Sequence, residues 1–270
     1  MNDENFLKKN GYIFKKNFFD KQDIAEFKTV SNKLHSYDEK TVNNLHNFDF
    51  SWKIITNSKL VGFLKKIYHP DKVYYLYNSH SIVQKKDEYV DPNWHRDNAH
   101  RIYGKGEDWK GDYNVLRVAI YLNENHNSLN GIKLIKGSHD GKGIICLLLR
   151  TMRLKLKRLY FNRIVRFFLD RIIGTTIKPK IGDCLFFYAN TYHAALRHKG
   201  EDTRKALFLS YGTNNLHSDN FMNYYIFNHK GDHKFDIKKN NFKDFIDILN
   251  KNDLHSNLPT KRKIDKDFSI

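Results

Sequence analysis

Residues 130–139 read NGIKLIKGSH, which places a short apolar run between two turn signals. Asn130-Gly131 and Gly137-Ser138 are dipeptides that favour turns, and the run from Ile132 to Ile135 suits a short β-strand. Similar β-rich runs lie on both sides of this stretch, at Val73 to Val83, Leu116 to Leu122, Cys184 to Tyr188 and Ala206 to Tyr211. The middle of the chain therefore predicts several short strands joined by turns.

The N-terminal part of the chain has a helical pattern instead. Asp20 is placed to cap a helix from Lys21 to His35. Apolar residues at helical spacing predict a second, amphipathic helix over residues 51–68, which Pro70 would end. Helices followed by many short strands predict a helix-flanked β-barrel or sandwich, and we expect one α+β domain over residues 1–270.

The composition is that of a globular chain rather than a disordered, fibrous or disulfide-bonded one. The 270 residues are 40% hydrophobic and 14% aromatic, which is enough for a packed core. Cys146 and Cys184 are too few for a disulfide framework or a zinc ribbon, so we expect a reducing, cytoplasmic location. No stretch approaches the roughly 20 apolar residues of a membrane span, and residues 1–20 are too charged for a signal peptide.

One segment contributes a large share of the net charge of +17. Between Arg150 and Arg171 the chain carries eight basic residues and one acidic residue. Apolar residues at offsets of three and four in the surrounding segment, residues 144–173, predict a helical insertion at about residues 144–176. Two interpretations stay open. The insertion packs on the barrel with its charges solvated, or it makes peripheral contact with an anionic membrane at the inner face.

Three His-x-Asp pairs offer candidate metal ligands, and their context separates them. His95 and Asp97 stand at i and i+2, so on a strand both side chains share one face and can point at a single ion. The pair that begins at His69 lies at a helix end beside a proline, and the pair at His217 lies in a polar stretch that we expect to be a loop. The His95 pair is therefore the preferred candidate.

Four motifs follow one another in a characteristic order. After the His95 pair, residues 130–139, NGIKLIKGSH, have the form NG-x-x-L-x-x-GSH, and residues 182–187, GDCLFF, have the form GD-x-L-x-F. His193 follows, and Arg204 stands 11 residues later. In this order and spacing the motifs resemble the phytanoyl-CoA dioxygenase-like family of Fe(II)/2-oxoglutarate-dependent oxygenases. The resemblance implies a double-stranded β-helix, a jelly-roll or cupin-like barrel, at about residues 73–212 with flanking N-terminal helices.

The resemblance also implies which residues hold the cofactors. His95, Asp97 and His193 match a facial triad of two imidazoles and one carboxylate, which holds Fe(II) and leaves positions open for 2-oxoglutarate and O₂. Arg204 matches the arginine that pairs with the distal carboxylate of 2-oxoglutarate, a role that suits a forked and permanent cation. Asn78, on the strand before the pair, is the candidate contact for the 1-carboxylate.

On this basis we expect a dioxygenase that hydroxylates an unactivated C–H bond and releases succinate and CO₂. The expected substrate is a small molecule, a glycan or a lipid-linked compound, and a cationic loop at residues 98–113 suits an anionic one. Asp97 argues against halogenation but leaves desaturation and cyclisation open. We expect His139 to be structural. The alternatives are a nucleic-acid-directed oxygenase, for which no base-reading residues are found, and a non-catalytic barrel that binds a ligand; we expect no nucleic-acid partner.

Overall fold

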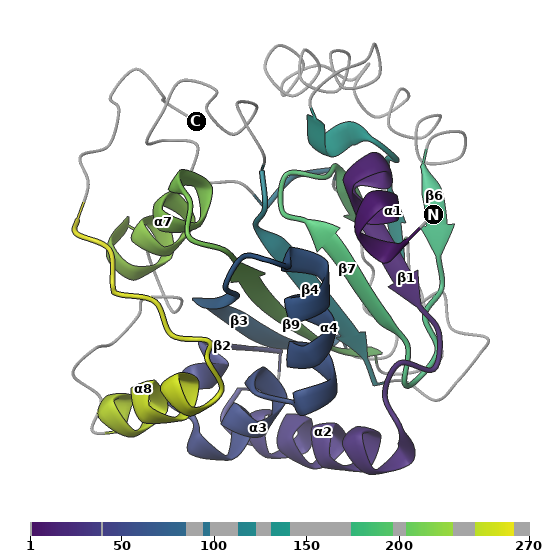
Figure 1. Ribbon diagram of the computed structural model, residues 1–270. Helices are drawn as coiled ribbons and strands as arrows, with labels where there is room; N and C mark the ends of the chain where they lie inside the picture. The colour runs from purple at the N-terminus through teal and green to yellow at the C-terminus, as the bar shows by residue number, and fades with distance from the viewer. Residues whose placement is uncertain are drawn as a thin grey trace, which may run out of the picture.

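Two antiparallel sheets and the helices around them make up the described part of the chain, an α+β fold (Figure 1). The computed structural model describes residues 2–38, 40–84, 94–97, 113–122, 131–140, 174–196, 204–228 and 241–261. The larger sheet has the order β1-β7-β4-β9-β3-β2, and the smaller has the order β6-β5-β8. Every pairing of neighbouring strands is antiparallel.

The strands of the six-stranded sheet are β1 (Tyr12–Lys15), β2 (Thr41–Asn43), β3 (Tyr74–Gln84), β4 (Leu116–Tyr121), β7 (Cys184–Tyr188) and β9 (Arg204–Gly212). Those of the three-stranded sheet are β5 (Ile132–Leu134), β6 (Thr175–Ile177) and β8 (His193–Ala195). The α-helices are α1 (Asp3–Asn10), α2 (Lys21–Leu34), α3 (Trp52–Ile55), α4 (Ser58–Tyr68), α7 (Leu216–Asn223) and α8 (Phe242–Lys251). Short 3-10 turns cover Leu45–Asn47, Asp49–Ser51 and Ser138–Asp140, and a π-helix covers Tyr224–Asn228.

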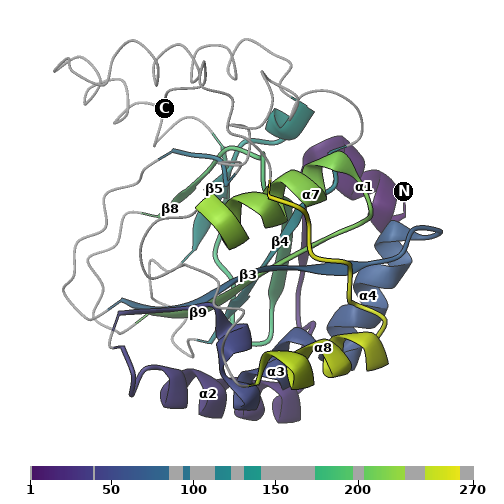
Figure 2. The ribbon, with the colours of Figure 1, turned by 90° about the vertical axis from the view of Figure 1, so that its left-hand side faces the viewer.

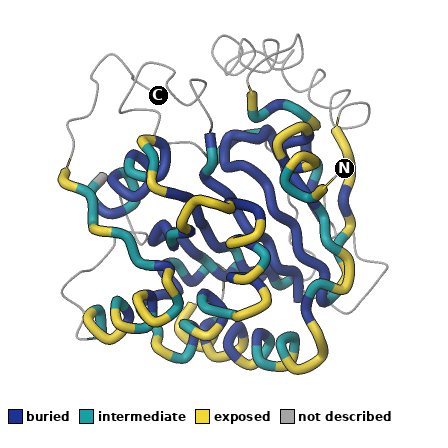
Figure 3. Tube along the Cα trace, in the orientation of Figure 1, coloured by how far each residue is buried: buried dark blue, intermediate teal, exposed yellow. Residues whose placement is uncertain are grey.

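Both faces of the six-stranded sheet are buried, which explains why β7 is apolar at every position. Cys184 and Phe186 pack with side chains of the helices, whereas Leu185 and Phe187 belong to a second core cluster. We call this second group the inter-sheet cluster, because both sheets contribute to it: Tyr12, Ala119, Tyr121, Ile132, Leu134, Ile177, Leu185, Phe187 and Ala206. Figure 3 shows the strands as the buried centre, with exposed positions on the outer turns of the helices.

The helices α1 and α4 lie on one side of the six-stranded sheet, and β5 and β8 lie on the other (Figures 1 and 2). Local sequence sets where the helices begin. Asp20 caps α2 by accepting hydrogen bonds from the amides of Gln22 and Asp23, both at 2.9 Å. Gly11 ends α1 in the left-handed conformation, with φ of +79°. These boundaries position β1 against β7 at the edge of the sheet.

The five predicted strands are confirmed, each within two residues of its expected ends, and so is the helix that begins at Lys21. The single helix predicted over residues 51–68 is wrong. The chain forms α3 and α4 instead, because Asn57 interrupts the pattern and caps the second helix by accepting a hydrogen bond from the amide of Leu60 at 3.1 Å. The loop predicted around His217 is also wrong, because Asn215 caps α7 there by accepting from the amide of Ser218 at 2.9 Å.

The predicted basic insertion, residues 144–176, falls almost entirely outside the described residues. Thr175 and the two residues after it form β6, which pairs with β5. Among the helices of the described ranges, none combines the length and the apolar character needed to cross a bilayer.

Candidate metal centre

An antiparallel bridge brings His95 and His193 together. The amide of His95 donates to the carbonyl oxygen of His193 at 2.9 Å, and the amide of His193 donates back to His95 at 3.0 Å. Residues that exchange both backbone hydrogen bonds hold their Cα atoms about 5.5 Å apart. The two imidazole centroids lie 4.3 Å apart. Backbone pairing alone therefore places two nitrogen ligands beside each other.

Asp97 completes the cluster. Its amide donates to the carbonyl oxygen of Ala189 at 2.7 Å, which fixes the chain just after His95 against the end of β7. The Oδ1 atom of Asp97 lies 3.5 Å from Nε2 of His95 and 3.8 Å from Nε2 of His193. One ligand atom from each of the three residues falls within 4.8 Å of the others. The sequence therefore named three residues that the fold brings to one point.

The three side chains fit a divalent transition-metal ion. Ligand atoms about 2.1 Å from an octahedral ion lie about 3 Å apart, so small side-chain adjustments would close the observed distances around one ion. Two imidazoles and one carboxylate are the donors that non-haem Fe(II) takes while keeping further positions open. The His95 side chain is 40% exposed and that of His193 is 7% exposed, so the cluster opens to solvent on the His95 side.

The tautomer of His193 is set by its backbone contact. Nδ1 lies 3.0 Å from the carbonyl oxygen of Thr191, and because a carbonyl can only accept, Nδ1 carries the proton. The unprotonated Nε2 then faces Asp97 and His95 with its lone pair, as a metal ligand requires. The ring also packs edge-on against Phe187, with centroids 4.9 Å apart.

Arg117 of β4 reaches the same cluster from the six-stranded sheet. Its Nε donates to Oδ2 of Asp97 at 3.0 Å, and its Nη1 donates to Oδ1 of Asn78 and Oγ of Ser210. The residue is 3% exposed. Because Arg117 holds Oδ2, the other oxygen of Asp97 is the one that faces the two imidazoles. Sequence reasoning missed this residue, although a charged side chain inside the apolar strand Leu116–Tyr121 was a usable signal.

The electrostatics of the cluster favour an ionised carboxylate and a neutral imidazole. Burial opposes ionisation of Asp97, but His193, His95 and Arg117 together outweigh it and hold the pKa of Asp97 well below its usual range. Burial, aided by the neighbouring His95, lowers the pKa of His193 to about 4. His193 is therefore neutral near pH 7, and Arg117 is the permanent positive charge beside Asp97. Both ligands are in the protonation state that metal binding requires.

The two predicted cosubstrate residues lie apart from each other, Asn78 beside Arg117 and Arg204 beside Gly131. Asn78 is 4% exposed, and its Oδ1 accepts from Arg117 and, at 3.1 Å, from Ser210. Arg204, the first residue of β9, is 9% exposed and donates through Nη2 to the carbonyl oxygen of Gly131 at 3.4 Å.

Strand register gives the spacing between Arg204 and the metal cluster. Gly131 stands three residues before Leu134, and Leu134 is the register partner of His193. At about 3.4 Å per residue, some 10 Å of strand separates the Arg204 anchor from this histidine.

A β-bulge delivers Asn78 to the cluster. The register between β3 and β9 shifts between Tyr75 and Ser79, and Tyr77 within the bulge has φ of +53°. Bulges near sites re-aim side chains, and a left-handed tyrosine persists only where its surroundings hold it. Here the Tyr77 ring is 1% exposed and packs against Phe245 of α8. The sequence of β3 did not predict this bulge.

Two further side chains, His139 and Tyr225, lie outside the group of His95, Asp97 and His193. Nε2 of His139 donates to the carbonyl oxygen of Lys8 at 2.9 Å, and the ring stacks on Tyr188 with centroids 5.1 Å apart, in agreement with the predicted structural role. Tyr225, in the π-helix, is near enough to the cluster for the charge of Asp97 to affect its pKa. Burial raises the pKa of Tyr225, and the carboxylate of Asp97 adds to the effect.

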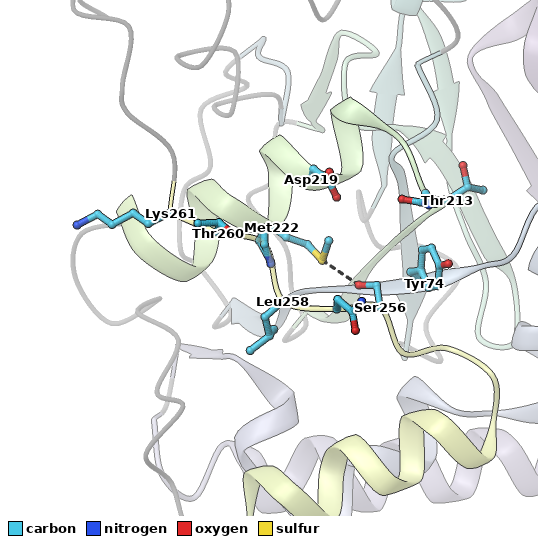
Figure 4. A pocket seen from close by; sticks show the side chains of 11 residues that line it. Tyr74, Thr213, Asp219, Met222, Ser256, Leu258, Thr260 and Lys261 are labelled. Atoms are coloured by element: carbon cyan, nitrogen blue, oxygen red, sulfur yellow. Dashed lines mark hydrogen bonds between the residues drawn. The ribbon is translucent and has the colours of Figure 1, made fainter.

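A cavity of about 530 Å³ lies elsewhere, between α7 and residues 256–261 (Figure 4). Asp219 and Lys261 are the charged residues of its lining, and Oγ of Ser256 donates to the sulfur of Met222 at 3.4 Å. None of the five predicted site residues lines it. The chemistry of the donor atoms, rather than the size of this cavity, identifies the candidate site.

Known proteins resemble this chain in their solved structures but not in their sequences. No family model and no curated protein sequence matches the chain. The epimerase SnoN in complex with Fe³⁺, alpha ketoglutarate and nogalamycin RO is 14% identical over 78% of this chain and 82% of its own, with a TM-score of 0.57. HygX from Streptomyces hygroscopicus, with nickel and 2-oxoglutarate bound, is 14% identical over 79% and 88%, with a TM-score of 0.60.

A third solved structure widens the range of reactions. The non-heme alpha ketoglutarate dependent carbocyclase SnoK from nogalamycin biosynthesis is 12% identical over 79% of this chain and 84% of its own, with a TM-score of 0.54. At these identities the likeness establishes the fold. The chain shares its fold with non-haem, 2-oxoglutarate-dependent enzymes.

Proposed function

We propose that the protein is an Fe(II)- and 2-oxoglutarate-dependent oxygenase. The observation that carries the proposal is the convergence of His95, Asp97 and His193, each with one ligand atom, within 4.8 Å. Two buried arginines support it, Arg117 beside Asp97 and Arg204 at Gly131, about 10 Å along the sheet from His193. A metal-binding cluster with permanent cations in the adjoining space suits a chelating dicarboxylate.

The iron, when bound with 2-oxoglutarate and O₂, supplies the oxidation of a C–H bond, coupled to conversion of 2-oxoglutarate into succinate and CO₂. The chain's own residues bind and orient these reactants. Thr191 fixes His193 as a neutral Nε2 donor, and Arg117 occupies Oδ2 of Asp97, so that Oδ1 is the oxygen that would hold the ion. A single oxygen ligand leaves a coordination position that a second would fill.

Cosubstrate binding falls to Arg204 and Asn78. Arg204 pairs with the distal carboxylate, since a buried guanidinium offers several donors in a fixed geometry. Asn78 offers its amide nitrogen to the 1-carboxylate, because its oxygen already accepts from Arg117 and Ser210. The order along the site is then metal cluster, keto acid and Arg204.

We infer further that the two sheets are the halves of a double-stranded β-helix at about residues 73–212, and that residues 1–270 act as one domain. The inter-sheet cluster supports this, because side chains of both sheets meet in it. Leu185 and Phe187 of β7 face Ile132 of β5 and Ile177 of β6 there, while their sequence neighbours face the helices. Such two-sided burial is what a closed pair of sheets produces.

The reaction we propose is hydroxylation of a small-molecule substrate. The presence of the Asp97 carboxylate supports oxygen transfer over halogenation, as the sequence resemblance implied. SnoN is described as an epimerase and SnoK as a carbocyclase, so proteins of this fold also catalyse reactions other than hydroxylation. Mass spectrometry of the product separates them, because hydroxylation adds one oxygen atom and epimerisation leaves the mass unchanged.

Metal uptake tests the proposed function directly. Purified protein titrated with Ni(II), a redox-inert substitute for Fe(II), should bind one ion per chain. Asp97→Ala and His193→Ala should each lose this binding, because two remaining ligands hold a divalent ion poorly. His139→Gln should bind as wild type does and serves as the matched histidine control. Full nickel occupancy in His193→Ala would contradict the assignment.

Contact of residues 144–173 with an anionic membrane, and with it a glycan or lipid-linked substrate, stays a proposal from the sequence. The support is the eight basic residues that the sequence carries between Arg150 and Arg171. Each Lys or Arg near an anionic leaflet adds about 1 kcal/mol of attraction. Co-sedimentation with vesicles should then depend on acidic lipid and be reversed by moderate salt. Equal pelleting with neutral and acidic vesicles would remove the membrane from the proposal.

A further inference from the structure

Helix α8 and the turn that follows it contact β3 at its bulge. The ring of Tyr77 packs against Phe245 of α8, with centroids 6.4 Å apart. After the helix, the carbonyl oxygen of Leu254 accepts a hydrogen bond from the amide of Tyr75 at 2.9 Å. Nδ1 of His255 lies 3.2 Å from the hydroxyl of Tyr77 and forms a hydrogen bond with it. One region of the chain therefore contacts the bulge through a ring, a carbonyl group and an imidazole.

The turn after α8 is itself fixed in place. The amide of Leu254 donates back to the carbonyl oxygen of Leu249 in α8 at 2.9 Å. The carboxylate of Asp253 pairs with Lys72, two residues before β3, at 2.5 Å. Asp253 has φ of +59°, a conformation that persists in a residue other than glycine only where its contacts hold it. These contacts set the position from which His255 reaches the strand.

The bulge is the part of β3 that carries Asn78. Between Tyr75 and Ser79, β3 advances four residues while its partner β9 advances two. Asn78 lies within this stretch, is 4% exposed and accepts from Arg117. One peptide bond joins it to Tyr77, so any rotation of Tyr77 away from φ of +53° would displace it. That φ is unfavourable for a residue with a Cβ atom, so the contacts of Tyr77 decide how firmly Asn78 is placed.

We propose that His255 is a positioning residue for cosubstrate binding. Its hydrogen bond to Tyr77 holds the bulge in the conformation that presents Asn78 to the 1-carboxylate of 2-oxoglutarate. The inference rests on the proposed function and extends the site to the C-terminal part of the chain. Burial, with Lys72 nearby, lowers the pKa of His255, so the ring is neutral at pH 7.5. Burial raises the pKa of Tyr77, so the phenol keeps its proton there as well.

This role predicts which part of the ligand depends on His255. Asn78 serves the 1-carboxylate, which every 2-oxo acid carries, whereas Arg204 serves the distal carboxylate. Loss of the positioning bond should therefore weaken 2-oxoglutarate and 2-oxopentanoate, which lacks the distal carboxylate, by the same factor. A ligand binds more weakly in proportion to the fraction of protein in the competent conformation. One hydrogen bond shifts such an equilibrium about five-fold.

The experiment titrates the full chain, loaded with Ni(II), with each of the two acids in a calorimeter at pH 7.5. Tyr77→Phe and His255→Leu each remove the hydrogen bond and should weaken both acids about five-fold. His255→Asn should bind both as wild type does, because its amide can take the place of Nδ1. Ser81→Ala is the matched control. It breaks the 2.8 Å hydrogen bond between Ser81 of β3 and Nε2 of His35, beyond the bulge, and should leave both affinities unchanged.

Thermal unfolding without ligand separates positioning from stability alone. Tyr77→Phe and Ser81→Ala should both melt below wild type, because each loses a hydrogen bond, but only Tyr77→Phe should lose affinity. Unchanged affinity in folded Tyr77→Phe or His255→Leu would overturn the inference alone. A loss confined to 2-oxoglutarate, or His255→Asn as weak as His255→Leu, would overturn it too. Nickel-loaded wild type that bound neither acid would overturn the proposed function as well.

Discussion

Arg117 is the residue on which the geometry of the proposed metal centre depends most. It joins Asp97 to Asn78 and Ser210, and it is a buried cation whose charge offsets that of the carboxylate. Arg117→Met should weaken nickel binding by about 10–100-fold, the usual effect of removing a group that orients a metal ligand. Its unfolding temperature should also fall, because Asp97 is left without its guanidinium partner.

The matched variant is Ser210→Ala, which removes one acceptor of Arg117 and leaves the contact to Asp97 in place. It should weaken nickel binding much less than Arg117→Met. Calorimetry measures the affinities, and circular dichroism confirms that each variant is folded. If folded Arg117→Met bound nickel with wild-type affinity, the hydrogen bond from Arg117 to Asp97 would not be needed for metal binding.

The metal-cluster residues were predictable because their signals are local. His95 and Asp97 stand two positions apart, and His193 follows a recognisable turn and strand motif. The charge of Arg117 inside an apolar strand was visible in the sequence, but its partners were not. Asn78 and Ser210 lie on other strands, and only the order β4-β9-β3 brings them to Arg117. Pairing across a sheet is a long-range property that one strand does not encode.

At the scale of elements, His139 links α1 to the sheet. It donates to the carbonyl oxygen of Lys8 in α1 and stacks on Tyr188 of β7. His139→Gln should lower the unfolding free energy near pH 7.5 by about 1 kcal/mol, the worth of one such hydrogen bond, while leaving nickel stoichiometry unchanged. Chemical denaturation measures the first quantity and calorimetry the second. Loss of nickel binding would make His139 part of the metal centre after all.

The same variant should change the dependence of stability on pH. Burial lowers the pKa of His139 in the folded state, despite the Lys8 carbonyl and the charge of Asp140, which both raise it. The unfolded chain therefore takes up the proton first. The stability present above the unfolded pKa of about 6.5 is lost as pH falls through the lower folded pKa. Denaturation at pH 7.5 and pH 5 should show a smaller loss in His139→Gln than in wild type.

Element boundaries followed from the sequence where a cap or a turn residue marks them. Asp20 before α2 and Gly131 before β5 stand where the sequence places them, and both boundaries were predicted. The break at Asn57 was missed because the apolar spacing continues across it in the next helix. The bulge at Tyr77 was missed because Phe245 of α8, against which the Tyr77 ring packs, lies far along the chain.

For the molecule as a whole, the proposed metal centre joins the two sheets. His193 begins β8 of the three-stranded sheet, while Asp97 is held by Arg117 in β4 of the six-stranded sheet. An ion bound to both residues ties together two parts that otherwise meet through the inter-sheet cluster. Unfolding separates these ligands along the chain and destroys the site. Ligand binding and folding should therefore be linked.

Nickel with 2-oxoglutarate should raise the unfolding temperature of wild type. A ligand present at 100 times its Kd stabilises the folded state by about 2.7 kcal/mol, which for a chain of this size corresponds to a shift of about 5 °C. A chelator should reverse the shift. Magnesium should give little shift, because that ion prefers an all-oxygen ligand set, and Asp97→Ala should give none with nickel. An equal shift with magnesium, or in Asp97→Ala, would mean that the ion binds elsewhere and that the two sheets are not joined through His193 and Asp97.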